Sequence, residues 1–104
     1  MNPPPTHLLR LYVAGQGAVS QRAVEDLRRL CKEALGGACE LEVVDVLARP
    51  DAAEAANILA LPTVVRERPL PARRVIGDLG DRERVLEGLD LHVARDVAKK
   101  GDAP

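Results

Sequence analysis

In the N-terminal half of the chain, two strand-like segments flank one helix-like segment, and this order constrains the fold more than any other feature. The first segment, His7–Gly15, is apolar on both faces of a strand, which is typical of a central strand covered by helices. The second, Gln21–Leu35, has apolar residues at helical spacing, with Ser20 as its expected N-cap and Gly36–Gly37 as its stop. The third, Cys39–Leu47, alternates as a strand does, and we expect its more apolar end to be buried. Together they predict a β-α-β unit.

The second half of the chain predicts four shorter elements. The whole order is then β-α-β-α-β-β-α, an α/β fold of the thioredoxin-like arrangement. In that arrangement a proline precedes the third strand, often after a cis peptide bond, and Pro62 has this position. The alternative interpretation is an ordinary proline at the start of a strand. The four elements are a helix over 49–60, a strand over 62–65, an antiparallel strand over 72–77 and a helix from Arg82 to about Val93, capped by Asp78 or Asp81.

The length of 104 residues predicts one domain. We place it at residues 8–94, after a disordered lead-in at 1–7 and before a flexible tail at 95–104. Apolar residues make up 46% of the chain, but Trp and Phe are absent and there is one Tyr. Aromatic side chains bury the most area per residue, so we expect modest stability or support from oligomerisation.

The charge balance excludes two classes of partner. The net charge of −1, from 15 basic and 16 acidic residues, gives no electrostatic footprint for nucleic acid or for a membrane surface. No apolar run reaches the roughly 18–20 residues of a membrane span. The N-terminus lacks the pattern of a signal peptide, so we expect a cytoplasmic protein.

The residues needed for redox chemistry are missing from the expected place. A thioredoxin-type enzyme needs a thiolate at the start of its first helix, yet Gly15–Ala23 contains no cysteine and no other nucleophile in a catalytic setting. Cys31 and Cys39 are eight residues apart, which matches neither C-x-x-C nor a zinc site, so we interpret them as small hydrophobic residues. His7 and His92 lack partners at metal-ligand spacing. We therefore predict no enzyme activity, no cofactor and no metal.

The most prominent charged feature is a group of four arginines around the expected hairpin. It has two interpretations: a solvated hairpin whose charges protect an edge strand, or a site for an acidic protein partner. Nucleic acid is disfavoured because no aromatic residues are available for base stacking. The four residues are Arg66, Arg68, Arg73 and Arg74.

Four segments resemble the KaiB family over residues 8–91: "LRLYVAG", "VVDVLARP", "ILALPTVV" and "PARRVIGDLGDRERVLEGLDL". The resemblance implies a non-enzymatic, circadian-clock-type regulator that binds the N-terminal ATPase ring of a KaiC-like hexameric ATPase. It also implies control over other partners, such as a KaiA-like protein or a clock-output histidine kinase. Finally, it implies a metamorphic chain with two folds. The ground-state fold (βαββααβ) is a homo-oligomer, such as a tetramer or dimer. It exchanges slowly with the thioredoxin-like fold.

The resemblance also implies which residues take part. The half of the chain from about Asp51 onward rearranges, and Gly88 inside the last expected helix costs about 0.5–1 kcal/mol relative to alanine. A close packing contact is the alternative explanation for Gly88. Asp90, late in the same helix, opposes the helix dipole. Implied partner-binding residues are Val46, Leu47, Asn57, Arg73 and Arg74, and implied fold-switch residues are Pro62, Pro69, Pro71, Gly88 and Asp90.

One alternative function stays open: a thioredoxin-like stress or signalling adaptor that interacts with a histidine kinase and sets no rhythm. The chain departs from the usual family pattern at the loop Gln16–Val19, which lacks an Asn-Thr-Pro-Asn type sequence. It also departs at Glu42 and Asn57, where lysine is common in the family. These departures favour binding to a KaiC-type ATPase over binding to a KaiA-type protein.

Overall fold

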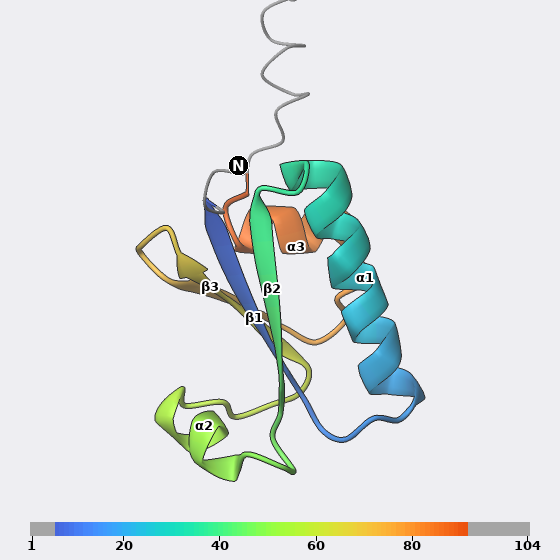
Figure 1. The fold of residues 1–104 in the computed structure, drawn as a ribbon, viewed down its shortest axis with the longest axis vertical. Helices are drawn as coiled ribbons and strands as arrows, with labels where there is room; N and C mark the ends of the chain where they lie inside the picture. The colour runs from blue at the N-terminus through green and yellow to red at the C-terminus, as the bar shows by residue number, and fades with distance from the viewer. Residues whose placement is uncertain (1–5, 92–104) are drawn as a thin grey trace, which may run out of the picture.

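The computed structural model describes residues 6–91, and a four-stranded sheet in the order β2-β1-β3-β4 forms its centre (Figure 1). β2 runs parallel to β1, whereas β3 is antiparallel to both β1 and β4. The predicted thioredoxin-like order β-α-β-α-β-β-α is confirmed. The elements are β1 (His7–Val13), α1 (Ala18–Leu35), β2 (Cys39–Asp45), α2 (Pro50–Ala55), β3 (Thr63–Arg68), β4 (Arg73–Ile76) and α3 (Arg82–Gly88).

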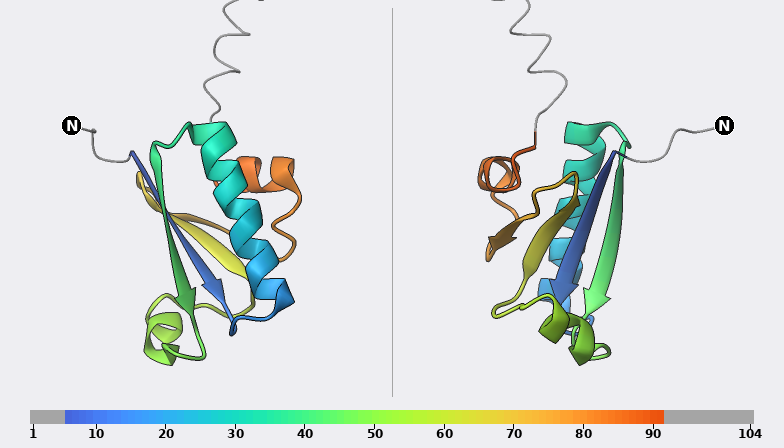
Figure 2. Two further views of the ribbon diagram at one scale, coloured as in Figure 1. Left: turned by 45° about the vertical axis from the view of Figure 1, so that its right-hand side comes forward. Right: turned by 90° about the vertical axis from the view of Figure 1, so that its left-hand side faces the viewer.

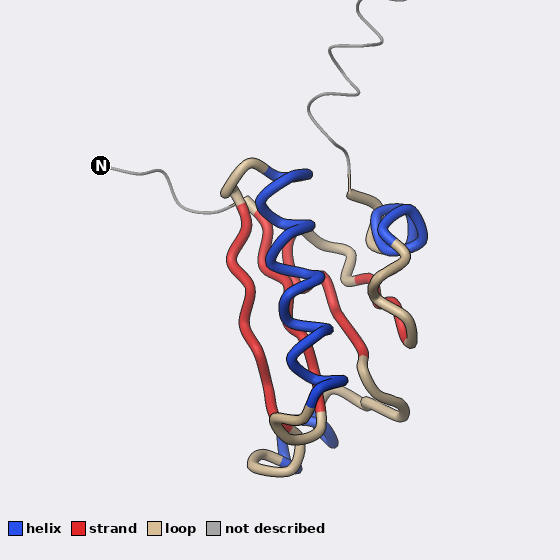
Figure 3. Tube along the Cα trace, turned by 90° about the vertical axis from the view of Figure 1, so that its right-hand side faces the viewer, coloured by secondary structure: helices blue, strands red, loops and turns tan. Residues whose placement is uncertain are grey.

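The helices lie on both faces of the sheet. α1 runs along one face (Figure 3), and α3 packs on the same side, whereas α2 lies at one end of the opposite face (Figure 2, right). As predicted, β1 contributes to both faces: Leu9 and Leu11 join the core under α1 and α3, and Tyr12 points to the α2 side. Among residues 6–91, no helix is both long enough and apolar enough to cross a membrane.

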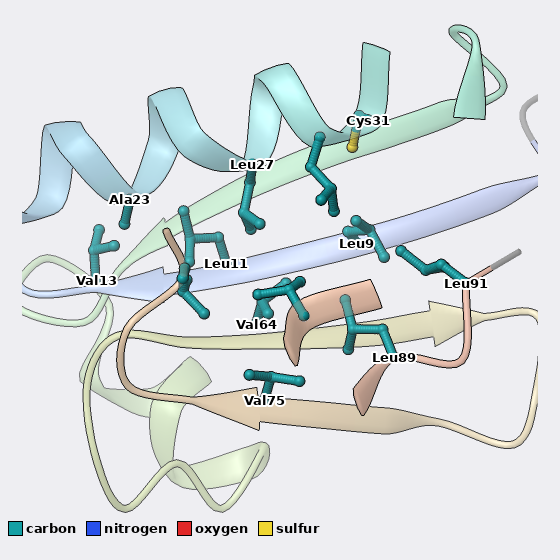
Figure 4. Close-up of a cluster of buried hydrophobic side chains, with 13 residues drawn as sticks. Leu9, Leu11, Val13, Ala23, Leu27, Cys31, Val64, Val75, Leu89 and Leu91 are labelled. Atoms are coloured by element: carbon teal, nitrogen blue, oxygen red, sulfur yellow. The ribbon is translucent and has the colours of Figure 1, made fainter. Parts of the chain in front are cut away.

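The main core lies between α1, α3 and the sheet (Figure 4). Leu27 of α1, Leu11 of β1 and Val64 of β3 are completely buried there, and Leu89 closes it from the end of α3. A smaller cluster on the other face gathers Tyr12, Val44 and Val65 under α2. Aliphatic side chains therefore build the main core, as the composition predicts, and Tyr12 is the aromatic residue of the smaller cluster.

The predicted start of α1 is wrong. The helix begins at Ala18, and Gly17, which has no side chain to cap it, is the N-cap. Ser20 lies inside the first turn, where it is buried and donates a hydrogen bond to the Ala14 carbonyl at 3.0 Å. Ser20 therefore ties the helix to the end of β1 and does not cap it.

The predicted burial of the end of β2 is also wrong. β2 is an edge strand, so Val43 and Leu47 are exposed and only Val44 is buried in this stretch. β2 has a neighbouring strand on one side only, so some of its apolar side chains stay in contact with solvent. The exposed Leu47 belongs to the candidate binding surface.

Two helices stop earlier than predicted, for one physical reason. α2 ends at Ala55 and α3 at Gly88, and each is followed by a residue with left-handed backbone, Asn57 (φ 56°) and Asp90 (φ 54°). The next amide donates back to a carbonyl five residues earlier, Ile58 to Ala53 and Leu91 to Leu86, which is a standard helix stop. Glycine is the usual residue at such a stop, so Asn57 and Asp90 do not signal a helix end in the sequence.

The remaining boundaries agree with the sequence in part. α1 ends at Leu35 and Gly36 (φ 56°) is its C-cap, as predicted. The peptide bond before Pro62 is cis, as are those before Pro69 and Pro71. β1 begins at His7, one residue before the predicted domain start at 8. Residues 1–5, the tail at 95–104, His92 and Val93 lie outside the described residues.

Candidate partner-binding surface

Exposed apolar side chains gather at the end of the sheet where β1 and β2 finish and β3 begins. β1 and β2 are parallel and β3 is antiparallel to β1, so their connections meet at this end, next to α2 (Figure 1). We call this the carboxyl-end surface. Its four residues are Val19, Leu47, Leu59 and Leu61, which are 74%, 72%, 85% and 41% exposed.

A cavity and a close contact join parts of this surface to the core of the domain. Val19 and Leu61 line a cavity of about 190 Å³ together with Ala14 and Pro62. Leu47 lies over Gly15, where an added Cβ would be 3.4 Å from its Cδ1 atom. Large exposed apolar patches mark interaction sites in monomeric proteins, so the surface fits a protein partner better than a small ligand.

Asp45, the last residue of β2, holds two loops of this surface in place. Its Oδ1 atom accepts hydrogen bonds from the Gly15 amide at 2.8 Å and from the Leu47 amide at 3.0 Å. The carboxylate therefore fixes the end of β1 relative to Leu47. The sequence analysis missed this residue, although an acidic side chain directly after the apolar pair Val43–Val44 was a signal for such a role.

Replacing Asp45 with alanine is expected to lower the free energy of unfolding by about 1–2 kcal/mol, because two amides lose their acceptor. Asp45→Asn keeps an acceptor oxygen at the same place and is expected to cost clearly less. Urea denaturation followed by circular dichroism measures both. Equal losses in the two variants would show that the hydrogen bonds from Gly15 and Leu47 do not contribute.

Arg74 braces the end of α2. Its guanidinium donates to the Asn57 carbonyl at 3.1 Å and to the Ala56 carbonyl at 3.0 Å, and so joins β4 to the end of α2. Val46 is half-buried against the smaller cluster. Of the five residues predicted to bind partners, the structure thus brings Val46, Leu47, Asn57 and Arg74 together around α2.

The fifth predicted residue, Arg73, lies elsewhere. Side chains alternate along β4, so Arg73 is on the face of Val75 and Arg74 is on the α2 face. Arg66, opposite Arg73 in the ladder, is buried and donates hydrogen bonds to backbone carbonyls. The prediction of one arginine cluster is therefore wrong: Arg66 is buried, whereas Arg68, Arg73 and Arg74 are exposed. Arg74 lies on the opposite face from Arg73 and braces the end of α2.

Asn57→Ala is expected to lower the free energy of unfolding by about 1 kcal/mol, because a Cβ without a polar group disfavours left-handed backbone. Asn57→Gly accepts that backbone and is expected to stay within a few tenths of a kcal/mol of the parent chain. Chemical denaturation of the three proteins checks this order. If alanine is as stable as asparagine, the left-handed stop after α2 is not what ends that helix.

The predicted switch residues have different surroundings from those expected. Gly88 is the last residue of α3, and an alanine Cβ there would overlap Cγ2 of Val75, so the packing alternative accounts for this glycine. Asp90 lies two residues beyond the helix, where Arg66 donates to its carbonyl at 3.2 Å. Gly88 thus lies in the last helix, as predicted, but at its end, whereas the placement of Asp90 inside that helix is wrong.

Ion pairs occupy the part of the α2 face that α2 leaves uncovered. The Arg10 guanidinium on β1 bonds Glu42 on β2 at 2.5 Å and reaches Glu67 on β3 at 3.5 Å. Glu42, one of the departures from the family pattern, is therefore matched by a basic partner in the same protein.

Within residues 6–91, no three His, Cys, Asp or Glu side chains form a group that could hold a metal ion.

Comparison with known sequences identifies the family. The KaiB domain model matches residues 10–91. The chain belongs to the KaiB family. It is 52% identical over 91 residues to the circadian clock oscillator protein KaiB of Prochlorococcus marinus, covering 88% of this chain and 76% of the relative. The KaiB of Synechococcus elongatus is 50% identical over 91 residues, with 88% and 89% covered. The family recognised from four sequence segments is thus confirmed.

Solved structures confirm the thioredoxin-like fold of this KaiB-family chain. The N-terminal domain of Synechococcus elongatus SasA matches with a TM-score of 0.69 at 22% identity, covering 86% of this chain and 88% of that domain. Mitochondrial thioredoxin 3 from Saccharomyces cerevisiae matches with a TM-score of 0.64 at 19% identity, covering 82% and 77%. At these identities the likeness concerns the fold alone.

Proposed function

We propose that this chain is a cytoplasmic, non-enzymatic clock regulator. It binds the N-terminal ATPase ring of a KaiC-like hexameric ATPase. By occupying the ring, it controls the access of other partners, such as a KaiA-like protein or a clock-output histidine kinase. The observation that carries this proposal is the carboxyl-end surface, which exposes four large apolar residues on a KaiB-family domain.

The way this surface is supported favours a binding role. Asp45 fixes the loops that carry Gly15 and Leu47, and Arg74 fixes the end of α2. Leu47 and Leu59 therefore project from braced segments, and a partner that covers them gains apolar burial at a low cost in ordering. A cavity of about 190 Å³ beside Val19 and Leu61 has room for a side chain of a protein partner.

We also propose that binding depends on a slow change between this fold and a homo-oligomeric ground state. The two halves of the chain differ in how much they bury: α1 has 18 residues and six buried side chains, whereas α2 has none buried and α3 has one. Elements with little burial open most easily. The proposed switch residues all lie in this second half, at Pro62, Pro69, Pro71, Gly88 and Asp90.

Size-exclusion chromatography with a KaiC-like ATPase and ATP tests the proposal. We expect a co-eluting complex that grows over hours, because a binding-competent state that is rarely populated slows and weakens apparent association. A complex that is already complete at the first time point would contradict the slow switch and keep the partner. No complex after a day, at concentrations well above those of the cell, would contradict the partner.

A further inference from the structure

The two cysteines meet at the junction between α1 and β2. Cys31 lies in the last turns of α1 and Cys39 is the first residue of β2, and the chain turns back between them at Gly36. Their sulfur atoms are 2.7 Å apart, and both are free thiols. Eight residues of separation hid this contact from the sequence analysis, because only the fold brings the two side chains together.

The surroundings hold the pair in position. Cys31 is 7% exposed and points into the main core (Figure 4), whereas Cys39 is half-buried at the edge of that core. The turn that joins them is anchored at Ala38, whose carbonyl accepts the His7 amide at 3.2 Å and the Thr6 hydroxyl at 3.0 Å. Linking the sulfurs therefore needs only a small closing motion of two side chains.

The two thiols also differ in acidity. The hydrogen bond with Cys39 lowers the pKa of Cys31, and the positive charge of Arg28 adds to this against the effect of burial. The same hydrogen bond raises the pKa of Cys39, and burial raises it further. Cys31 is thus the thiol that ionises first, with Cys39 as its proton donor, and thiolates are the reactive form of cysteine.

We propose that Cys31 and Cys39 form a redox-modifiable site that a hydroperoxide closes into an intramolecular disulfide. The Cys31 thiolate attacks a peroxide oxygen, the O–O bond breaks, and Cys31 becomes a sulfenic acid while the departing hydroxide takes the proton lost by the thiol. The Cys39 sulfur then attacks the Cys31 sulfur, the S–O bond breaks, and the second hydroxide leaves with the Cys39 proton. Two thiols lose two electrons and two protons, and hydrogen peroxide becomes two waters.

The disulfide would fasten the end of α1 to the start of β2. This site lies at the opposite end of β2 from Leu47 and the carboxyl-end surface, and it does not depend on the proposed function. Because β1 bonds to the same turn through His7, the link would also brace the first strand of the sheet.

Hydrogen peroxide treatment of the full chain at low micromolar concentration, followed by intact mass spectrometry and non-reducing peptide mapping, tests the proposal. We expect a monomer that has lost two hydrogen atoms, no alkylatable thiol, one Cys31–Cys39 cross-linked peptide, and full recovery with dithiothreitol. Cys31→Ser and Cys39→Ser each keep the size of the side chain and are expected to lose that cross-link completely. Two free thiols after treatment, sulfinic acid without a link, or links only between two copies would each overturn it.

Discussion

Arg66→Ala is expected to lower the free energy of unfolding by about 2–4 kcal/mol, a large part of the stability of a domain this size. The Arg66 side chain is only 4% exposed. Its Nη2 atom donates to the Pro71 carbonyl at 2.7 Å and its Nη1 atom to the Asp90 carbonyl at 3.2 Å. Alanine would remove both donors and leave a void where the long side chain packs.

The size of this effect follows from what Arg66 connects. It extends from β3 to the loop before β4 through Pro71, and to the segment after α3 through Asp90. α3 has one buried residue of its own, so its position depends on such contacts and on Leu89 and Leu91 beyond its end. A hydrogen bond from a charged donor contributes about 1.5–3 kcal/mol, and two of them act on this one attachment.

Two further variants separate packing from hydrogen bonding. Arg66→Met fills most of the space and needs no desolvation of a charge, so we expect it to cost about half as much as alanine. Arg66→Lys keeps the charge but not the forked geometry that serves two carbonyls, and we expect an intermediate loss. Urea denaturation monitored by circular dichroism measures all three. A loss below about 0.5 kcal/mol for alanine would show that Arg66 does not brace α3.

The arrangement of the fold was predictable because it depends on periodicity, which the sequence displays directly. Alternation in Leu9, Leu11 and Tyr12 placed β1 at the centre with two covered faces, and helical spacing around Leu27 located α1. These patterns reflect burial along whole elements. They depend on many residues at once, so single exceptions do not hide them.

Features that depend on one residue's backbone or on distant partners were not predictable. Asn57 and Asp90 end their helices in a conformation that glycine usually adopts. Arg66 looks like any surface arginine until β3 and α3 are placed around it. The contact between Cys31 and Cys39 needs both the helix end and the strand start, and neither local pattern contains it.

Only part of the candidate surface was predictable, because the rest depends on how distant segments are brought together by the fold. Leu47 and Asn57 came from the family resemblance, but Val19, Leu59 and Leu61 joined them only once the strand directions put three connections at one end. Arg73 shows the limit of neighbours in sequence, because alternation along β4 separates it from Arg74.

The double variant Leu47→Glu/Leu59→Glu is expected to weaken the complex with a KaiC-like ATPase at least 100-fold, which is about 3 kcal/mol. Both side chains are largely exposed in the free chain, at 72% and 85%. Their replacement therefore removes no internal packing, while a partner that buries them would have to desolvate two unpaired carboxylates. Dissociation constants from fluorescence anisotropy or calorimetry, read after equilibration over hours, measure the effect.

Leu70→Glu is the matched control. Leu70 is 78% exposed, but it lies in the connection between β3 and β4, at the opposite end of β3 from Leu61. The control changes the net charge in the same direction and removes a leucine of similar exposure, and we expect less than a threefold effect. Equal urea midpoints for the three proteins would show that folding is intact.

The pattern across these variants decides what the surface does. Loss of binding in the double variant alone would mean that the partner buries the end of the sheet that Asp45 and Arg74 support. Equal loss in Leu70→Glu would mean that added negative charge, and not the position of the leucines, governs association, and the carboxyl-end surface would no longer be the binding site. Unchanged binding in the double variant would leave the exposed leucines unexplained by the ATPase, because burial of two such side chains contributes several kcal/mol wherever it occurs.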